Sequence, residues 1–140
     1  MALDRLDHYS IRTTKLKITR DFYVDVMNLE EGFRPNFEFP GHWLYCGDRA
    51  VVHLIGVDPD DTSALTDFLG QKSDEELAGA GAIDHIAFRA TDLASLKDRL
   101  AAKHINCVER TIPELDLHLV FLDDPNGITI ELNYIAAEAG

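Results

Sequence analysis

The amino-acid sequence predicts an α+β fold built from two tandem βαβββ modules. The first observation is a repeat: the segment LDHYSIRTT at residues 6–14 returns as IDHIAFRAT at residues 83–91, with the Asp, His, Arg and Thr unchanged. The second is that each copy alternates like a half-buried strand and leads into a helix-like stretch and then short strands. The third is length, because 140 residues suit one compact domain or two small modules sharing a core. The chain is therefore expected to contain two copies of one structural unit.

Period-two alternation predicts the opening strand of each module, at residues 6–12 and 83–89. In both copies bulky apolar residues occupy one face, and the histidine, at the strand's third position, lies on the more polar face. The segments 31–55 and 106–134 are predicted as short strands separated by turns, one of them at the Pro-Asn-Gly sequence 125–127. Each module thus has the order β-α-β-β-β.

Helical spacing of apolar residues predicts the helix that follows each opening strand. In the second module Asp92 is the expected N-cap of the helix. The apolar stripe of the first helix is Ile18, Phe22, Val26 and Met27, and that of the second is Leu93, Leu96 and Leu100.

Composition shifts give the expected boundaries. The first module should occupy residues 1–56 and the second residues 82–135. Between them, residues 57–81 are acidic and rich in Asp, Gly and Ala, which predicts a connector with a helical turn near residues 63–68. Residues 136–140 are predicted as a short frayed tail.

Net charge and cysteine usage exclude several function classes. A formal charge of −12 opposes binding to nucleic acid or to an anionic membrane. No apolar run is long enough to span a bilayer, and the first residues do not resemble a signal peptide. Cys46 and Cys107 have no spacing typical of a disulfide framework. A cytoplasmic protein with a small-molecule partner is therefore expected.

Four potential metal ligands occupy two pairs of equivalent positions in the repeat. His8 and His85 stand at the same place in the two opening strands, while His53 aligns with Glu131 in the two final strands. Alternation puts Glu131 on the face opposite the apolar residues of its strand, where a carboxylate needs a partner or a metal ion.

Each of these residues also has a simpler interpretation. A strand histidine is usually a half-buried, hydrogen-bonded residue, and Glu131 could pair with Arg12 or Arg89. The joint pattern favours a divalent metal site built from His8, His85 and Glu131, as in open sites with two histidines and one carboxylate. His53 is then either a further ligand or a nearby acid or base.

Paired βαβββ modules with these residues resemble the vicinal oxygen chelate superfamily. Its members include glyoxalase I, extradiol dioxygenases, fosfomycin-resistance transferases, methylmalonyl-CoA epimerase and bleomycin-binding proteins. Phe22-Tyr23 in the first helix and the segment 123–127 before Ile-Glu-Leu are typical of it, and the resemblance covers nearly the whole chain. It implies a curved mixed sheet around a metal-bearing cleft. It also implies a homodimer, with each site formed within one chain or across the two.

The position of His53 has different roles in different branches of this superfamily. In extradiol dioxygenases it implies that His8, His85 and Glu131 hold Fe(II) or Mn(II), with His53 moving protons. In glyoxalase I and the epimerase the position of His53 supplies a fourth ligand, and Ni(II), Zn(II) or Co(II) become candidates. Phe121 departs from the dioxygenase habit of a tyrosine at that place.

The leading prediction is an extradiol-dioxygenase-like enzyme acting on a small catecholic or vicinal-oxygen substrate. The alternatives are a four-ligand lyase or isomerase, and a non-catalytic protein that sequesters an aromatic or drug molecule. The aromatic segment 33–45 is either a packed hairpin or a wall for a ring-shaped substrate, and the direction of His42 and His118 is open. The candidate pocket residues are Arg12, Arg89, Trp43, Tyr45, His118 and Phe121.

Overall fold

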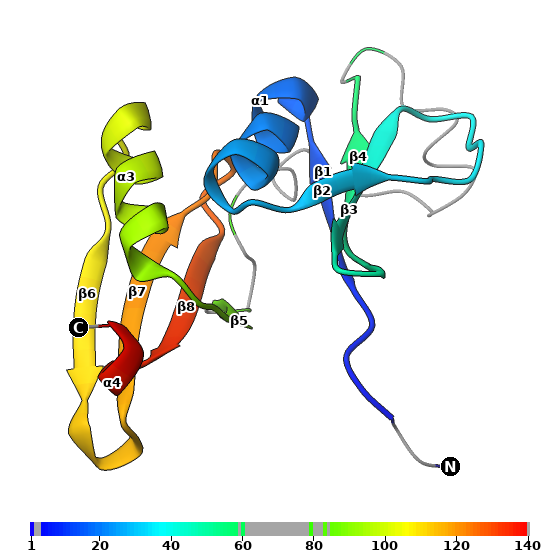
Figure 1. Ribbon diagram of the computed structural model, residues 1–140. Coiled ribbons are helices and arrows are strands. Elements are labelled where there is room, and N and C mark those ends of the chain that lie inside the picture. The colour runs from blue at the N-terminus through cyan, green and yellow to red at the C-terminus, as the bar shows by residue number, and fades with distance from the viewer. Residues whose placement is uncertain (2–3, 59, 61–78, 80–82, 84, 140) are drawn as a thin grey trace. The chain divides into compact units, whose positions relative to one another are not determined.

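A computed structural model describes residues 1, 4–58, 60, 79, 83 and 85–139, and it divides into two compact units (Figure 1). The first comprises Met1–Val24 and Asn28–Leu77, and the second comprises Asp25–Met27 and Ala78–Gly140. The predicted βαβββ order is confirmed in each. The elements from the first half of the chain are β1 (Tyr9–Thr13), α1 (Leu16–Asp21) with a π-helical continuation (Phe22–Val26), β2 (Glu30–Gly32), β3 (Gly41–Cys46) and β4 (Arg49–Gly56).

The elements of the second unit repeat this order. They are β5 (Ile86–Arg89), α3 (Leu93–Lys103), β6 (Val108–Ile112), a 3₁₀ turn (Pro113–Leu115), β7 (Leu117–Asp123), β8 (Thr129–Ile135) and α4 (Ala136–Ala139). Within the described residues, no helix has both the length and the apolar character that crossing a membrane requires.

The first unit contains a four-stranded mixed sheet in the order β1-β4-β3-β2, with β1 parallel to β4 and the other pairs antiparallel. Ser10 lies beside His53, and Trp43 lies opposite His53, so these three side chains share one face. Leu54 and Ile11 share the other face and are buried. The two faces therefore differ as the sequence predicts: one is core, and the other carries the candidate site.

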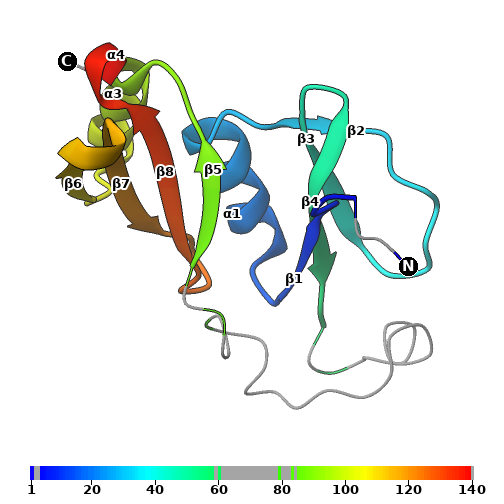
Figure 2. The ribbon, with the colours of Figure 1, turned by 90° about the horizontal axis from the view of Figure 1, so that it is seen from below.

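The second unit has a sheet of the same topology, in the order β5-β8-β7-β6 (Figure 2). Ala87 and Phe121 flank Glu131 and share its face. Ile130 and Leu132 point to the opposite face and are buried. The predicted alternation of the last strand is confirmed.

Local sequence explains the two main helices. Asp92 takes a left-handed conformation (φ 62°) at the start of α3, and its Oδ1 accepts a hydrogen bond from the backbone N–H of Ser95 at 3.2 Å, so the predicted cap is confirmed. The predicted leucine stripe of α3 is buried. In the first helix the predicted stripe is wrong at Ile18, which is exposed, because the chain widens into a π-helix after Asp21 and buries Thr19 instead.

Other details differ from the sequence prediction. β1 and β5 begin one residue after His8 and His85, because the first paired residues are Tyr9 and Ile86. The predicted tail contains α4, whose alanines favour helix and whose first N–H donates to the carbonyl oxygen of Asp116.

Most of the predicted connector, residues 57–81, lies outside the described residues, and so does the whole of the predicted helical turn at residues 63–68.

Candidate functional site

Three rings stack on the open face of the first sheet. The imidazoles of His8 and His53 lie with centroids 3.7 Å apart and planes 14° apart. The ring of Trp43 stacks on the same His53 at 3.9 Å and 10°. His53 is thus the middle ring of a continuous stack. It belongs to β4, and Trp43 on β3 packs against its ring.

His8 is oriented by the residue before it. Its Nδ1–H donates to Oδ2 of Asp7 at 2.7 Å, and this hydrogen bond is the largest cause that lowers the pKa of Asp7. A carboxylate that holds one ring nitrogen fixes the tautomer and leaves the other nitrogen as the ligand, which is a common arrangement around metal-binding histidines. Nε2 is therefore the ligand atom that His8 can present.

His53 is held from its own strand. Its Nε2 lies 3.0 Å from the carbonyl oxygen of Ala50, and because a carbonyl can only accept, Nε2 carries the proton. Nδ1 is then the basic nitrogen. Burial is the largest cause that lowers the pKa of His53, followed by the charge of His8, with a smaller contribution from Arg34. A half-buried neutral imidazole is suited to accept a proton.

In the second unit the predicted ligands form a close pair. Nε2 of His85 lies 3.9 Å from Oε1 of Glu131. Metal bonds to imidazole nitrogen and carboxylate oxygen are about 2.0–2.2 Å, so two atoms at this separation can reach one ion between them. The ring of Phe121, opposite Glu131 across the strands, meets His85 edge-on at 6.3 Å and makes this side of the pair apolar.

Within the described residues, no group of three or more His, Cys, Asp or Glu is arranged to hold a metal ion. The predicted ligands occur instead as two pairs, His8 with His53 and His85 with Glu131, one pair in each unit. Imidazole nitrogen and carboxylate oxygen are the donor types in each pair, and both suit a divalent cation with open coordination positions. His8 and His85 are both partly exposed, so an ion can reach them.

The remaining predicted pocket residues divide between the two faces. Arg12 lies beside Ile55 on the face of Trp43 and His53, and Arg89 lies on the face of Glu131. The hydroxyl of Tyr45 donates to the carbonyl oxygen of Phe33 at 2.6 Å, which holds this side chain near the edge strand β2.

His118 lies on the face opposite Glu131, because it pairs with Tyr134 and alternates with Phe121 along the strand. His42 is likewise on the face opposite His53, since it pairs with Leu54.

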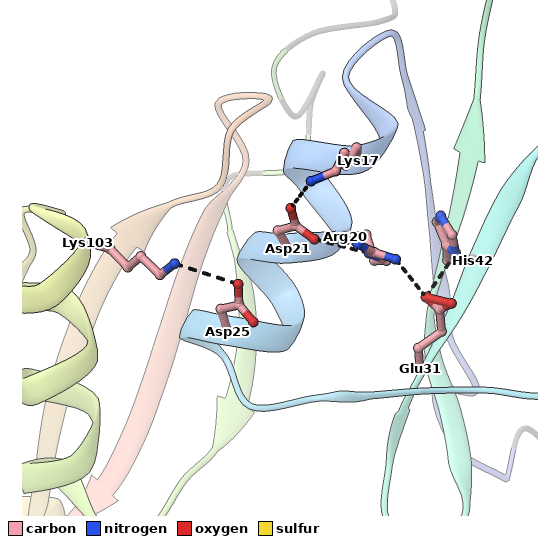
Figure 3. Close-up of polar contacts among 7 residues, drawn as sticks. All are labelled: Lys17, Arg20, Asp21, Asp25, Glu31, His42 and Lys103. Carbon is pink, nitrogen blue, oxygen red and sulfur yellow. Dashed lines mark hydrogen bonds and ion pairs between the residues drawn. The ribbon is translucent and has the colours of Figure 1, made fainter.

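A charge network explains His42 in the first unit (Figure 3). Nδ1 of His42 lies 3.0 Å from Oε2 of Glu31, and the same carboxylate oxygen lies 3.8 Å from Arg20 of α1. Arg20 also pairs with Asp21. Lys17, one helical turn before Asp21, contacts the same carboxylate group. The network connects α1 to the edge strand β2 and to its neighbour β3.

The second unit repeats this arrangement around His118. Its Nε2 donates to Oε1 of Glu109 at 2.9 Å, and Lys97 of α3 contacts the same oxygen at 3.0 Å. Nδ1 of His118 lies 3.0 Å from the hydroxyl of Thr111. A basic residue on the helix, a glutamate on the outer strand and a histidine on the next strand thus recur in both units. Their role is to join helix and sheet.

We expect the stability of the second unit to depend on pH through Glu109. The hydrogen bonds from His118 and then Lys97 lower the pKa of Glu109 below its ordinary value of 4.5. A carboxyl group with a lowered pKa stabilises the fold above its unfolded-state pKa, and this contribution is lost as pH falls through the folded-state value. Urea unfolding across that acid range should therefore show a steeper loss of stability in the wild type than in Glu109→Gln.

Glu114→Gln is the matched control, because Glu114 is exposed in the 3₁₀ turn. It should retain the wild-type slope. A Glu109→Gln curve that runs parallel to the wild type through the same range would contradict the assignment.

The structure adds two candidate residues that the sequence reading missed. Asp7 was part of the repeat, and its place next to a predicted ligand was the available signal. Arg34 precedes β3, and its guanidinium lies 5.0 Å from the ring centroid of Phe37 and 5.3 Å from that of Phe39. No sequence signal identified it, because its neighbours come together only in the folded sheet.

Known proteins share the sequence pattern and the fold of this chain. The sequence profile of the Glyoxalase/Bleomycin resistance protein/Dioxygenase superfamily matches residues 5–132. No curated protein gives a match.

Solved structures share the fold along almost the whole chain. Lactoylglutathione lyase from Agrobacterium tumefaciens is 22% identical, with a TM-score of 0.60 and 98% of each chain covered. A glyoxylase/bleomycin resistance protein/dioxygenase domain from Frankia sp. EAN1pec is 18% identical, with a TM-score of 0.69 and coverage of 95% of this chain and 93% of that one. The fosfomycin resistance protein FosX from Listeria monocytogenes is 14% identical, with a TM-score of 0.65 and coverage of 99% and 100%. At these identities the likeness concerns the fold.

Proposed function

Because this chain belongs to the Glyoxalase/Bleomycin resistance protein/Dioxygenase superfamily, we propose that it is a divalent-metal-dependent enzyme acting on a small substrate with two adjacent oxygens. His8, His85 and Glu131 bind the ion, and His53 transfers protons. The reaction that this division of roles favours is an extradiol-dioxygenase-like oxygenation with Fe(II) or Mn(II).

The stack of His8 on His53 carries this proposal. The lone pair of an imidazole nitrogen lies in the plane of its ring, and the two rings are nearly parallel at 3.7 Å. Their nitrogens therefore point within separate parallel planes and do not converge on one point. His53 is close to the ion that His8 would bind, but it is oriented as a neighbour of that ion and not as a further ligand.

The hydrogen bonds of the two rings assign their roles. Asp7 holds Nδ1 of His8, which leaves Nε2 for the metal. The carbonyl of Ala50 holds Nε2–H of His53, which leaves Nδ1 to accept a proton from a substrate hydroxyl and later to return it. Trp43 keeps the ring of His53 in place by stacking on it. When bound, the metal supplies Lewis acidity and a template for the two substrate oxygens.

A second candidate is a lyase or isomerase with four protein ligands, in which His53 joins the metal. The contact between His8 and His53 favours it, because a rotation of one ring would bring a second nitrogen toward the same ion. The structural likeness to a lactoylglutathione lyase supports it as well. In this candidate Ni(II), Zn(II) or Co(II) is the expected ion.

A third candidate is a protein that sequesters an aromatic molecule without chemistry. The rings of Trp43, Phe37 and Phe39 favour it, since Phe37 stacks on Phe39 at 5.2 Å and lies 6.4 Å from Trp43. Phe39 is buried, but the half-buried rings of Phe37 and Trp43 are suited to bind a flat ligand.

Anaerobic loading distinguishes the three candidates. The purified protein is loaded with Fe(II), Mn(II), Ni(II), Zn(II) or Co(II) in turn, and each form is assayed for oxygen uptake with catechols and for turnover of lactoylglutathione. Oxygen uptake by the Fe(II) or Mn(II) form is expected. Turnover only in the Ni(II), Zn(II) or Co(II) form would replace the proposal with the second candidate. Binding of catechols without turnover in every form would replace it with the third.

A further inference from the structure

We propose that Arg34 binds the carboxylate of the substrate, so that the site selects planar aromatic carboxylates. This proposal rests on the proposed function for the reaction that follows binding. Its own evidence is the position of Arg34, the rings around it and the pairing of its guanidinium.

Glycine at position 41 places Arg34 over the open face of the first sheet. Gly41 pairs with Ile55, and Trp43 pairs with His53, so a side chain at position 41 would share the face of those residues. A Cβ added there would meet the backbone carbonyl oxygen of Leu54 first, and it would lie 2.9 Å from one terminal nitrogen (Nη2) of Arg34 and 3.0 Å from its Nε. The guanidinium therefore lies directly beside the backbone at position 41, where only glycine fits.

Aromatic rings connect this guanidinium with the candidate site. Arg34 lies against Phe37 and Phe39, and Phe37 is 6.4 Å from Trp43, which stacks on His53. Phe37 and Phe39 also pack with Ile55, which belongs to the same face. A row of rings thus leads from the proposed proton-transfer residue to a fixed positive charge.

The charge of Arg34 is not balanced by a carboxylate among the described residues. Its Nη2 donates to the carbonyl oxygen of Phe39 at 2.9 Å, and its Nε is buried and without a hydrogen-bond partner in the described part of the chain. Burying an unpaired donor costs about 1–3 kcal/mol, so packing alone does not explain an arginine here. Burial also lowers the pKa of Arg34, which reflects the same desolvation.

The remaining donors fit a carboxylate. Arginine has five N–H groups in a fixed fork. One of them donates to the carbonyl oxygen of Phe39, and the Nε–H is buried without a partner in the described part of the chain, so the other N–H groups of Nη1 and Nη2 remain. The outer N–H groups can hold two carboxylate oxygens in parallel, which is the geometry that arginine favours. A single guanidinium balances one negative charge, which matches a monocarboxylate better than a phosphoryl group. The half-buried rings of Phe37 and Trp43 supply the surface for a flat hydrocarbon part, while Phe39 is buried.

Fluorescence of Trp43 tests the proposal directly, because it is the chain's one tryptophan. The full chain is titrated with benzoate and with benzamide, which has nearly the same shape and no charge. Saturable quenching by benzoate is expected in the wild type, with benzamide at least about tenfold weaker, a difference of about 1.4 kcal/mol. Arg34→Gln should weaken benzoate by a similar factor and leave benzamide unchanged, while Arg34→Lys should fall between the two.

Arg49→Gln is the matched control, since Arg49 is an exposed arginine at the start of β4, and it should bind benzoate like the wild type. Equal binding of the two probes, unchanged benzoate binding in Arg34→Gln, or no saturable response to benzoate would each overturn the proposal. Metal loading of the wild type is measured beside these titrations. If the wild type binds no metal but the Arg34 effect remains, the proposed function is wrong and the carboxylate site stands. If the wild type binds metal but Arg34→Gln binds benzoate as the wild type does, only the carboxylate site is removed.

Discussion

Replacing His53 with glutamine is expected to lower turnover by about 10²–10⁴-fold, the usual contribution of a general acid or base, and to leave the metal content unchanged. Glutamine can still donate to the carbonyl of Ala50, but it has no basic nitrogen for the substrate proton. The ring contact with His8 and Trp43 is lost at the same time. Turnover is measured as oxygen uptake with saturating catechol, and metal content by elemental analysis of the same samples.

His42→Gln is the matched control. His42 lies on the opposite face, where it pairs with Glu31, so its loss should affect stability and leave turnover near the wild-type value. A His53→Gln protein that loses its metal together with its activity would contradict the role given to His53. It would make His53 a ligand and favour the lyase or isomerase.

Leu54→Ala should be the most destabilising of the substitutions considered, with a loss of about 2–5 kcal/mol in the free energy of unfolding. The Leu54 side chain is fully buried and follows His53 directly on β4. It pairs with Ile11 on β1 and with His42 on β3, so it lies on the inner face at the centre of the first sheet. Its removal leaves a cavity under the strand that positions His53.

Urea unfolding followed by Trp43 fluorescence measures this loss, since Trp43 belongs to the same sheet. Leu115→Ala is the control with the same change of side chain, because Leu115 is 64% exposed, and it should shift the transition by less than about 0.5 kcal/mol. If the two leucines cost the same, the first sheet does not have the core that the register implies.

The repeat explains why so much of the fold could be predicted from the sequence. Alternation around Ile11 and Ile130 distinguishes the buried face from the open face, and the same pattern appears twice. The predicted βαβββ order along the chain and the cap at Asp92 follow from such local signals. The mixed sheet was implied by the resemblance to the superfamily. The π-helical continuation after Asp21 does not follow from local signals, because both helix types bury residues at similar spacing and only packing decides between them.

The candidate site could be predicted only in part. Spacing identified His8, His53, His85 and Glu131, but it could not show that His8 and His53 stack. A ring's rotation depends on its hydrogen bonds, and the contact with Asp7 is visible only in the structure.

The position of His118 could not be predicted from the sequence. The sequence makes it a candidate for the substrate pocket, and the register of β7 and β8 places it on the face opposite Glu131. Its equivalence to His42 was correct evidence of a shared role, which is the contact with a glutamate on the neighbouring strand. The repeat of the basic residue, at Arg20 and Lys97, was also present in the sequence. Pairing across strands was needed to interpret it.

The most direct measurement is the amount of Fe(II) or Mn(II) bound per chain by the wild type and by Glu131→Gln, after anaerobic loading and removal of free metal. Glu131→Gln keeps the shape of the side chain that faces His85 and removes its charge. Stoichiometric binding by the wild type and a loss of affinity of at least about 100-fold in the variant are expected, because a direct ligand should exceed the 10–100-fold effect of an outer partner. Glu114→Gln should bind like the wild type. Equal binding by the wild type and Glu131→Gln, whether strong or weak, would contradict a metal site at these residues.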